Sequence, residues 1–306
     1  MGYFGRSRGS YGGLLVTIDL YAQRQGSRLF SAIFLGIVQG LTEFLPISSS
    51  AHIRIVGEFM NKAQDPGARF TAITQIGTEL AVLIFFRNDI KAIVASWVKQ
   101  VLLRGELSAE GKGQARMGWL IIVGSLPIVV LGYLGKDIIT NDLRSLWLIA
   151  SVMIIFGLIL GFADKVGKSD RTLDQLNSKH GILYGAAQAL ALVPGVSRSG
   201  ATIAMGRFLG YTREAALRYS FLLALPAVFG SGLYELKDAF SLDAAPNVFT
   251  IPETFVATGV AFVIGYIVIA WLLKFVSTKS FRPFIIYRVA LGSLILVLLA
   301  TGVISA

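Results

Sequence analysis

Residues 39–52 read QGLTEFLPISSSAH, and they contain a break inside an otherwise apolar segment. An apolar run from Leu29 to Leu45 stops at Pro46 and the serines that follow it, and resumes at Ala51. Proline cannot continue the preceding helix, and serine is a preferred residue at a helix start. The stretch therefore predicts two short helices joined by a turn.

Residues 188–201, QALALVPGVSRSGA, repeat this pattern after an apolar run from Gly181 to Val193. The two stretches match at a constant offset of 149 residues: Gly36 with Gly185, Gln39 with Gln188, Ile47 with Val196, Ser48 with Ser197 and Ser50 with Ser199. Each is too short and too interrupted to cross about 30 Å of hydrocarbon. A broken backbone is tolerated at that depth only inside protein or beside water, so we expect two re-entrant helical hairpins.

Six longer apolar runs are long enough to span a membrane. They are Phe70–Phe86, Met117–Leu134, Leu146–Phe162, Ala215–Tyr234, Phe255–Phe275 and Ile285–Ile304. The chain is 54% hydrophobic and only 15% charged, whereas soluble domains are about 25% charged. The sequence predicts an all-α integral membrane protein of six transmembrane helices plus two re-entrant hairpins.

Each predicted hairpin is followed by three spans, so the second copy of the repeat should lie upside down relative to the first. We expect a single membrane domain over residues 29–306, with repeat one at about 29–163 and repeat two at about 181–306. Residues 1–28 are expected to be a flexible N-terminal extension. The hairpin tips should meet near the midplane, where paired broken segments of two halves commonly form a binding site.

The net charge of +10 is distributed over the short connections between spans. Lys and Arg concentrate in residues 87–116, 164–180 and 274–282 and are sparse in the intervening connections. This alternation indicates that the three basic connections are cytoplasmic, and it argues against a nucleic-acid partner. The first hairpin then enters from the outer face, although the four arginines of residues 1–28 favour the opposite side.

The serines at both breaks fall at the start of a new helix, where free N–H groups and the helix dipole favour an anion. Ser48, Ser50, Ser197 and Ser199 are therefore candidate phosphate-binding residues, although serines there can also simply cap helices and pack closely. Arg198 supplies a planar fork that can hold phosphate oxygens, and a guanidinium at membrane depth needs an anionic partner.

Glu43 is an ionisable residue inside an apolar segment, and Gln39 lies one helical turn before it. A carboxylate and an amide oxygen on one helix face suit Mg²⁺ or Ca²⁺, which also take ligands from phosphate and water. These two residues are the candidate metal ligands. The alternative is that Glu43 pairs with Arg198 without a metal.

His52 follows the serine run within one turn and is a candidate general acid or base; the alternative is an interfacial histidine held by backbone carbonyls. Glu79 either lines the same site or pairs with a neighbouring helix. Arg213, Glu214 and Arg218 are interpreted as a charged cluster at a helix end.

These segments resemble the undecaprenyl-diphosphatases, bacterial membrane phosphatases associated with bacitracin resistance. The similarity includes residues 39–52 and 194–202, and continues through Arg213-Glu214-Ala215-Ala216, residues 221–226, Phe281-Arg282-Pro283-Phe284 and Tyr287-Arg288. The resemblance implies hydrolysis of undecaprenyl pyrophosphate with a divalent cation, recycling the cell-wall carrier lipid. It also implies a bacterial plasma membrane protein with its active site opening to the outer face.

Carried over by position, Ser49 resembles the attacking hydroxyl, with water as the alternative nucleophile and His52 handling the proton. Ser197, Arg198 and Thr202 resemble the residues that grip the phosphate. Many family members have Glu where this chain has Gln39, which leaves Glu43 as the only acid of the pair. A homo-oligomer is compatible with this arrangement.

A polyprenyl-phosphate transporter or flippase is the alternative function, because inverted repeats with broken helices at the midplane are also a transporter architecture. The fold alone does not separate the two. A transporter needs binding groups without a nucleophile and base. The combination of Ser49, His52, Glu43 and Arg198 therefore favours the phosphatase.

Overall fold

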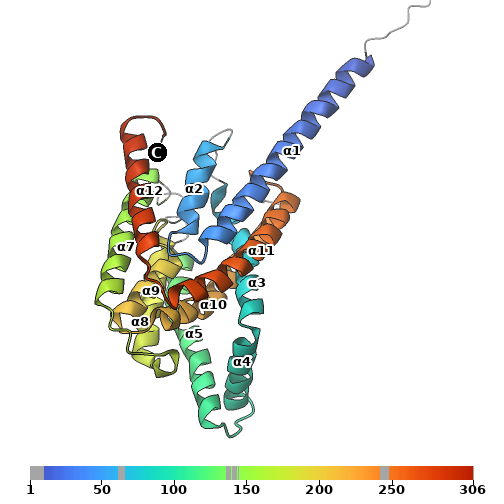
Figure 1. The fold of residues 1–306 in the computed structure, drawn as a ribbon. Helices are drawn as coiled ribbons and strands as arrows, with labels where there is room; N and C mark the ends of the chain where they lie inside the picture. The colour runs from blue at the N-terminus through green and yellow to red at the C-terminus, as the bar shows by residue number, and fades with distance from the viewer. Residues whose placement is uncertain are drawn as a thin grey trace, which may run out of the picture.

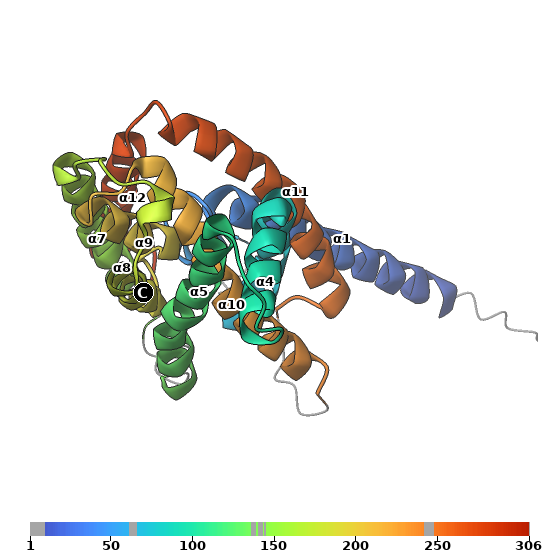
Figure 2. The ribbon, with the colours of Figure 1, turned by 90° about the horizontal axis from the view of Figure 1, so that it is seen from below.

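The computed structural model describes residues 10–60, 66–135, 139, 143, 145–241 and 248–305, and side chains from residue 26 onward. The described chain is helical and contains no β-strand, in agreement with the predicted class (Figure 1). Its helices gather into one bundle, from which the beginning of the first helix projects, as both views show (Figure 1, Figure 2).

All six predicted transmembrane helices are present, which makes this a multi-pass membrane protein. They are α3 (Gly67–Phe85), α5 (Ala109–Leu134), α7 (Leu146–Val166), α10 (Arg213–Ala239), α11 (Ile251–Val276) and α12 (Arg282–Ala300). Each is apolar enough and long enough to cross hydrocarbon. The last one ends four residues earlier than its apolar run suggested, at Ala300 instead of Ile304.

Both predicted breaks separate pairs of helices. In the first half, α1 (Ser10–Thr42) and α2 (Ser49–Phe59) flank the break. In the second, α8 (Ser178–Ala189) leads through the short 3₁₀ helix η3 (Leu190–Leu192) to the break before α9 (Arg198–Phe208). Helix α1 begins at Ser10, so much of the segment expected as a flexible extension is helical and continuous with the first half-helix; residues 1–9 lie outside the described chain.

Residues 87–116, expected as a basic loop, form mostly helix. Helix α4 (Arg87–Val101) folds back against the start of α5, and the two are tied by a hydrogen bond from Ser96 Oγ to Gln114 Oε1. None of the residues of α4 is buried. Its polar composition therefore resembles that of a loop, although the segment is a surface helix. This helical hairpin forms one end of the molecule (Figure 1).

The repeat-related glycines Gly36 and Gly185 bring each hairpin close to a transmembrane helix. A Cβ on Gly36 would collide with the backbone of Ala257 in α11, and one on Gly185 with the backbone of Gly124 in α5. Small residues allow such close helix approach in membranes. The same sequence position therefore anchors both hairpins, each on a span of the opposite half.

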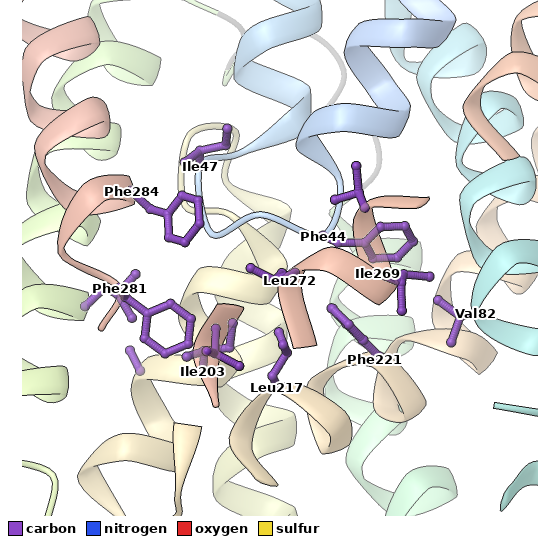
Figure 3. Close-up of a cluster of buried hydrophobic side chains, with 14 of the residues drawn as sticks. Phe44, Ile47, Val82, Ile203, Leu217, Phe221, Ile269, Leu272, Phe281 and Phe284 are labelled. Carbon is purple, nitrogen blue, oxygen red and sulfur yellow. The ribbon is translucent and has the colours of Figure 1, made fainter. Parts of the chain in front are cut away.

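An apolar core lies directly beneath the first break (Figure 3). Phe44 and Ile47 from the break pack over residues of α9, α10, α11 and α12, including Ile203, Leu217 and Leu272. Phe44 also meets Phe221 edge to face, with ring centroids 5.1 Å apart. The apolar side chains of the break are therefore buried in this core, and its polar side chains lie outside the core, where they can contact one another.

Arg288 of α12 joins the two breaks. Its guanidinium donates to the carbonyl oxygens of Pro46 (3.1 Å), Val196 (3.1 Å) and Gly195 (2.7 Å), and to that of Met153 in α7 (3.0 Å). The side chain is fully buried, and no carboxylate pairs with it in the described part of the chain. The three carbonyls of the breaks, which no helix satisfies, thus receive donors from one residue.

We predict that Arg288→Met destabilises the protein, because it leaves three buried carbonyls of the breaks without donors, at about 1 to 3 kcal/mol each. The midpoint of thermal unfolding in detergent should fall by roughly 10 °C. Arg282→Met, at an exposed position of the same helix, is the control and should change little. An unchanged or raised midpoint for Arg288→Met would show that the buried charge of Arg288 does not stabilise the protein.

Candidate functional site

Glu43 is the centre of a buried polar cluster between the two breaks. Its Oε2 accepts hydrogen bonds from Gln39 Nε2 (2.6 Å), Ser49 Oγ (2.6 Å) and Gln75 Nε2 (3.2 Å). Its Oε1 accepts from Arg198 Nη2 at 2.7 Å. Gln39 and Ser49 are near Glu43 in sequence, Gln75 belongs to α3, and Arg198 belongs to the second repeat. All four side chains therefore converge on the Glu43 carboxylate.

Arg198 reaches across from the second break and bridges two acids. Its Nη2 lies 2.7 Å from Glu43 Oε1 and 2.7 Å from Glu79 Oε1. Both alternatives for Glu79 hold together, because it pairs with another helix and in doing so joins the site. The expectation that Arg198 needs an anionic partner is met by carboxylates in this structure. Its Nη1 is buried and has no hydrogen-bond partner in the described chain.

Three atoms of this cluster are buried without a partner among the described residues: Gln39 Oε1, Glu79 Oε2 and Arg198 Nη1. Native proteins rarely leave such groups unsatisfied, so each of the three can accept or donate a hydrogen bond to a water, an ion or a substrate atom. The two oxygens are hard acceptors suited to Mg²⁺ or Ca²⁺, and the guanidinium nitrogen is suited to an anion. The residues therefore fit a cation together with a phosphate, with Glu79 providing a freer oxygen than Glu43.

Ser48 and Ser197, the repeat-related residues that precede α2 and α9, share an unusual backbone conformation. Their φ angles are 73° and 70°, a backbone region that residues other than glycine seldom adopt. They differ in capping: Ser197 Oγ accepts from Gly200 N at 3.1 Å, whereas Ser48 makes no side-chain cap. The first N–H groups of α2 are thus left free of a side-chain cap, which favours an anion at that helix start.

The other hydroxyls of the second break make contacts within the protein. Ser199 Oγ donates to the carbonyl of Leu45 at 3.1 Å and so ties the second break to the first. Thr202 Oγ1 lies 2.8 Å from the Arg198 carbonyl and also contacts Ser220 Oγ. In the first break, Ser50 Oγ lies 3.3 Å from Ser48 Oγ, its one hydrogen-bonding partner among the described residues, and Ser50 remains partly exposed.

His52 does not contact the serine hydroxyls, in contrast to the expected arrangement. Its Nδ1 lies 2.7 Å from the Ser48 carbonyl oxygen, and its Nε2 lies 2.7 Å from the hydroxyl of Tyr287 in α12. Both ring nitrogens are thereby occupied. The group positioned to accept the Ser49 proton is the Glu43 carboxylate.

Sequence reasoning missed Gln75, Tyr287 and Arg288 as members or supports of the site. Gln75 precedes Glu79 by four residues, the same spacing as Gln39 and Glu43, and that repetition was a usable signal. Arg288 was detectable as a charge inside an apolar span. Nothing in the sequence indicates that Tyr287 meets a histidine 235 residues away.

The charged residues at the start of α10 lie apart from this cluster, as predicted. Arg213 pairs with Asp164 at 2.7 Å and Arg218 with Asp89 at 2.7 Å. Arg218 lines a cavity of about 610 Å³ together with residues of α4, α5, α10 and the 3₁₀ helix η2 (Leu173–Gln175), and no residue of the Glu43 cluster lines it. These residues therefore lie at a helix end, outside the Glu43 cluster.

Comparison with known proteins gives consistent matches over nearly the whole chain. The family model described as bacitracin resistance protein BacA matches residues 32–294. The undecaprenyl-diphosphatase of Pseudarthrobacter chlorophenolicus is 60% identical over 277 residues, 90% of this chain and 99% of that protein. Undecaprenyl-diphosphatase 2 of Agrobacterium fabrum is 58% identical over 273 residues, 89% of this chain and 96% of that protein.

We predict opposite balances for glycine at the two strained serines. Ser48→Gly relieves a conformation that costs on the order of 1 kcal/mol and removes no cap, so it should stabilise the protein. Ser197→Gly gains the same relief but loses its side-chain cap, worth a few tenths of a kcal/mol against glycine and about 1 kcal/mol against alanine. Thermal unfolding in detergent should rank Ser48→Gly above the parent and above Ser197→Gly. The reverse order would show that the strain is not relieved by glycine.

Proposed function

Because the chain belongs to the bacitracin resistance protein BacA family, we propose that it is a membrane phosphatase that hydrolyses undecaprenyl pyrophosphate to undecaprenyl phosphate and inorganic phosphate. The relatives named undecaprenyl-diphosphatase match this chain over nearly all of their own length. The family resemblance in residues 39–52 and 194–202 falls on the same cluster that the fold buries between its breaks.

The observation that carries the proposal is the 2.6 Å hydrogen bond from Ser49 Oγ to Glu43 Oε2. A hydroxyl that donates to a buried carboxylate is a nucleophile beside a base. Binding and release of a lipid phosphate require neither group, so this contact favours the phosphatase over a transporter on the same inverted repeat.

In the proposed reaction, Ser49 Oγ attacks the terminal phosphorus of the pyrophosphate. The bond from that phosphorus to the bridging oxygen breaks, the Ser49 proton passes to Glu43, and undecaprenyl phosphate leaves. Water then attacks the phosphoserine, the P–O bond to Ser49 breaks, and inorganic phosphate is released with Ser49 restored. Glu43 gives the first proton to the departing undecaprenyl phosphate, then takes a proton from the attacking water and returns it to Ser49 Oγ as the P–O bond breaks.

Negative charge on the transferring group is met from both halves of the repeat. Arg198 Nη1 has no partner in the described chain and can bind a phosphate oxygen without releasing Glu43 or Glu79. The uncapped start of α2 places backbone N–H groups beside Ser49. Phosphoryl transfer depends mainly on positioning and on such charge stabilisation.

A divalent cation, Mg²⁺ or Ca²⁺, is proposed to be held by Gln39 and by the carboxylates of Glu43 and Glu79. Gln39 Oε1 and Glu79 Oε2 are the oxygens that lack partners in the described residues. When bound, the cation would neutralise charge on the pyrophosphate oxygens. Ser48, Ser50, Ser197, Ser199 and Thr202 line or brace the phosphate pocket in this proposal.

We place the protein in the bacterial plasma membrane with both breaks forming re-entrant hairpins and the site opening to the outer face. The support is the alternation of basic connections along the sequence, which puts the α4–α5 hairpin in the cytoplasm. Helix α2 leaves the first break away from that hairpin (Figure 1). The prenyl chain would lie between spans in the lipid.

The direct test measures phosphate released from undecaprenyl pyrophosphate by the purified protein in detergent. The rate of phosphate release by Ser49→Ala should be about a thousandfold or more below that of the parent, because the attacking atom is lost. Glu43→Gln should fall by on the order of 10² to 10⁴, because the amide cannot accept the proton. Ser31→Ala, a partly exposed serine of α1 outside the cluster, is the control and should keep full activity. Substantial turnover by Ser49→Ala would mean that water is the direct nucleophile.

A metal titration tests the proposed ligands. Gln39→Glu adds a charged oxygen where a partnerless one now stands, so half-maximal phosphate release should need less metal. Glu79→Gln removes a charged ligand and should need more. Gln175→Glu, an exposed position between α7 and α8, introduces the same change outside the site and should leave the requirement unchanged. If none of the variants shifts the titration, these residues do not hold the cation.

A further inference from the structure

His52 is held at both ring nitrogens by groups that are not serine hydroxyls. The Ser48 carbonyl oxygen lies 2.7 Å from Nδ1 and the Tyr287 hydroxyl 2.7 Å from Nε2. The two rings are nearly parallel, with an interplanar angle of 11° and centroids 5.5 Å apart. His52 is buried, whereas Tyr287 is 43% exposed.

The partners determine which nitrogen carries the proton in neutral His52. A carbonyl oxygen can only accept, so the hydrogen must be on Nδ1. Nε2 then has a lone pair that accepts from the Tyr287 hydroxyl. This tautomer uses the imidazole as a bridge from α12 to the residue before the proposed nucleophile.

The backbone at Ser48 has a strained conformation that neighbouring contacts must hold. Ser48 has a φ of 73°, and its side chain makes no cap on α2. Its carbonyl oxygen accepts the His52 backbone N–H at 3.2 Å and lies 2.7 Å from His52 Nδ1, and the next residue, Ser49, donates to Glu43. A strained conformation persists only when surrounding contacts determine it, and the Nδ1–H of His52 is one such contact.

We propose that Tyr287 is a positioning residue that acts through His52: it holds the imidazole in its Nδ1–H form against the Ser48 carbonyl and so orients Ser49. In this role His52 exchanges no proton with the nucleophile. The inference rests on the proposed phosphatase function for its kinetic consequences, but the hydrogen-bonded bridge itself can be observed without any activity.

Substitutions of His52 separate positioning from proton transfer. The side-chain amide of asparagine can place an N–H close to the position of Nδ1, whereas that of glutamine extends toward the position of Nε2. His52→Asn should therefore keep activity within about tenfold of the parent, and His52→Gln should fall with His52→Ala by on the order of 10²-fold. If His52→Asn is as inactive as His52→Ala, His52 is a general base and the proposal is overturned.

Tyr287→Phe keeps the stacked ring and removes only the hydroxyl. Its kcat should fall by about tenfold with KM within about twofold, because Ser49 is less well oriented while substrate binding is unaffected. The shape of the pH profile should not change, since no group that exchanges protons in the reaction is removed. A kcat equal to that of the parent would refute the role of Tyr287.

Nitrogen-15 NMR of histidine-labelled protein in detergent, above neutral pH, observes the bridge directly because the chain has only two histidines. The parent should show His52 as the Nδ1–H tautomer, and Tyr287→Phe should shift its Nε2 signal. The control is Tyr211→Phe, which removes the hydroxyl 2.7 Å from His180 Nδ1 and should shift only the His180 signals, with phosphate release unchanged.

The spectra and the kinetics fail separately. An Nε2–H tautomer for His52 in the parent would contradict the bridge whatever the activity. The predicted spectra in a protein that releases no phosphate would retain the bridge and reject the proposed function instead.

Discussion

The hydrogen bonds from Arg288 to backbone carbonyls are the interaction on which the site depends. Two broken helices leave backbone carbonyl groups that no helix satisfies, and hydrocarbon could not satisfy them either. One guanidinium provides donors for Pro46, Gly195 and Val196, and thereby fixes the two breaks to each other. Two further contacts join the same breaks: Ser199 donates to the Leu45 carbonyl, and Arg198 pairs with Glu43. A buried charge without a carboxylate is costly, and here the cost is offset by the number of carbonyls it satisfies.

A second charge balance is built on top of this brace. Two carboxylates, Glu43 and Glu79, share one guanidinium nitrogen of Arg198, so the cluster carries more negative than positive formal charge when both acids are ionised. That excess suits a bound cation, and the partnerless atoms Gln39 Oε1, Glu79 Oε2 and Arg198 Nη1 lie on the residues of this balance. The same arrangement that stores unsatisfied hydrogen-bonding capacity is the one a pyrophosphate with its metal could satisfy.

The two halves of the repeat have divided their tasks. The first half contributes the acids, the amides and an uncapped helix start with Ser49. In the second half Ser197 caps its own helix, and the position equivalent to Ser49 is Arg198. Tyr287 and Arg288, adjacent on α12, support one break and both breaks respectively. The backbone of the two breaks therefore remains similar while their side chains differ: Ser49 donates to Glu43 in the first half, and Arg198 pairs with Glu43 and Glu79 from the second.

The sequence by itself determined the six spans, the two breaks and their repetition, because length, hydropathy and proline or serine placement are local properties that the bilayer makes decisive. It also offered the pairing of Glu43 with Arg198 as the alternative to metal binding, since neither charge is tolerated alone at that depth. Helix α4 was missed because an amphipathic surface helix has the composition of a loop. Only the tertiary structure decided that Ser49 is bonded to Glu43, that His52 is held by Tyr287, and that Gln75 and Glu79 complete the cluster. Those partners come from helices far apart in sequence, and their pairing depends on how the bundle packs.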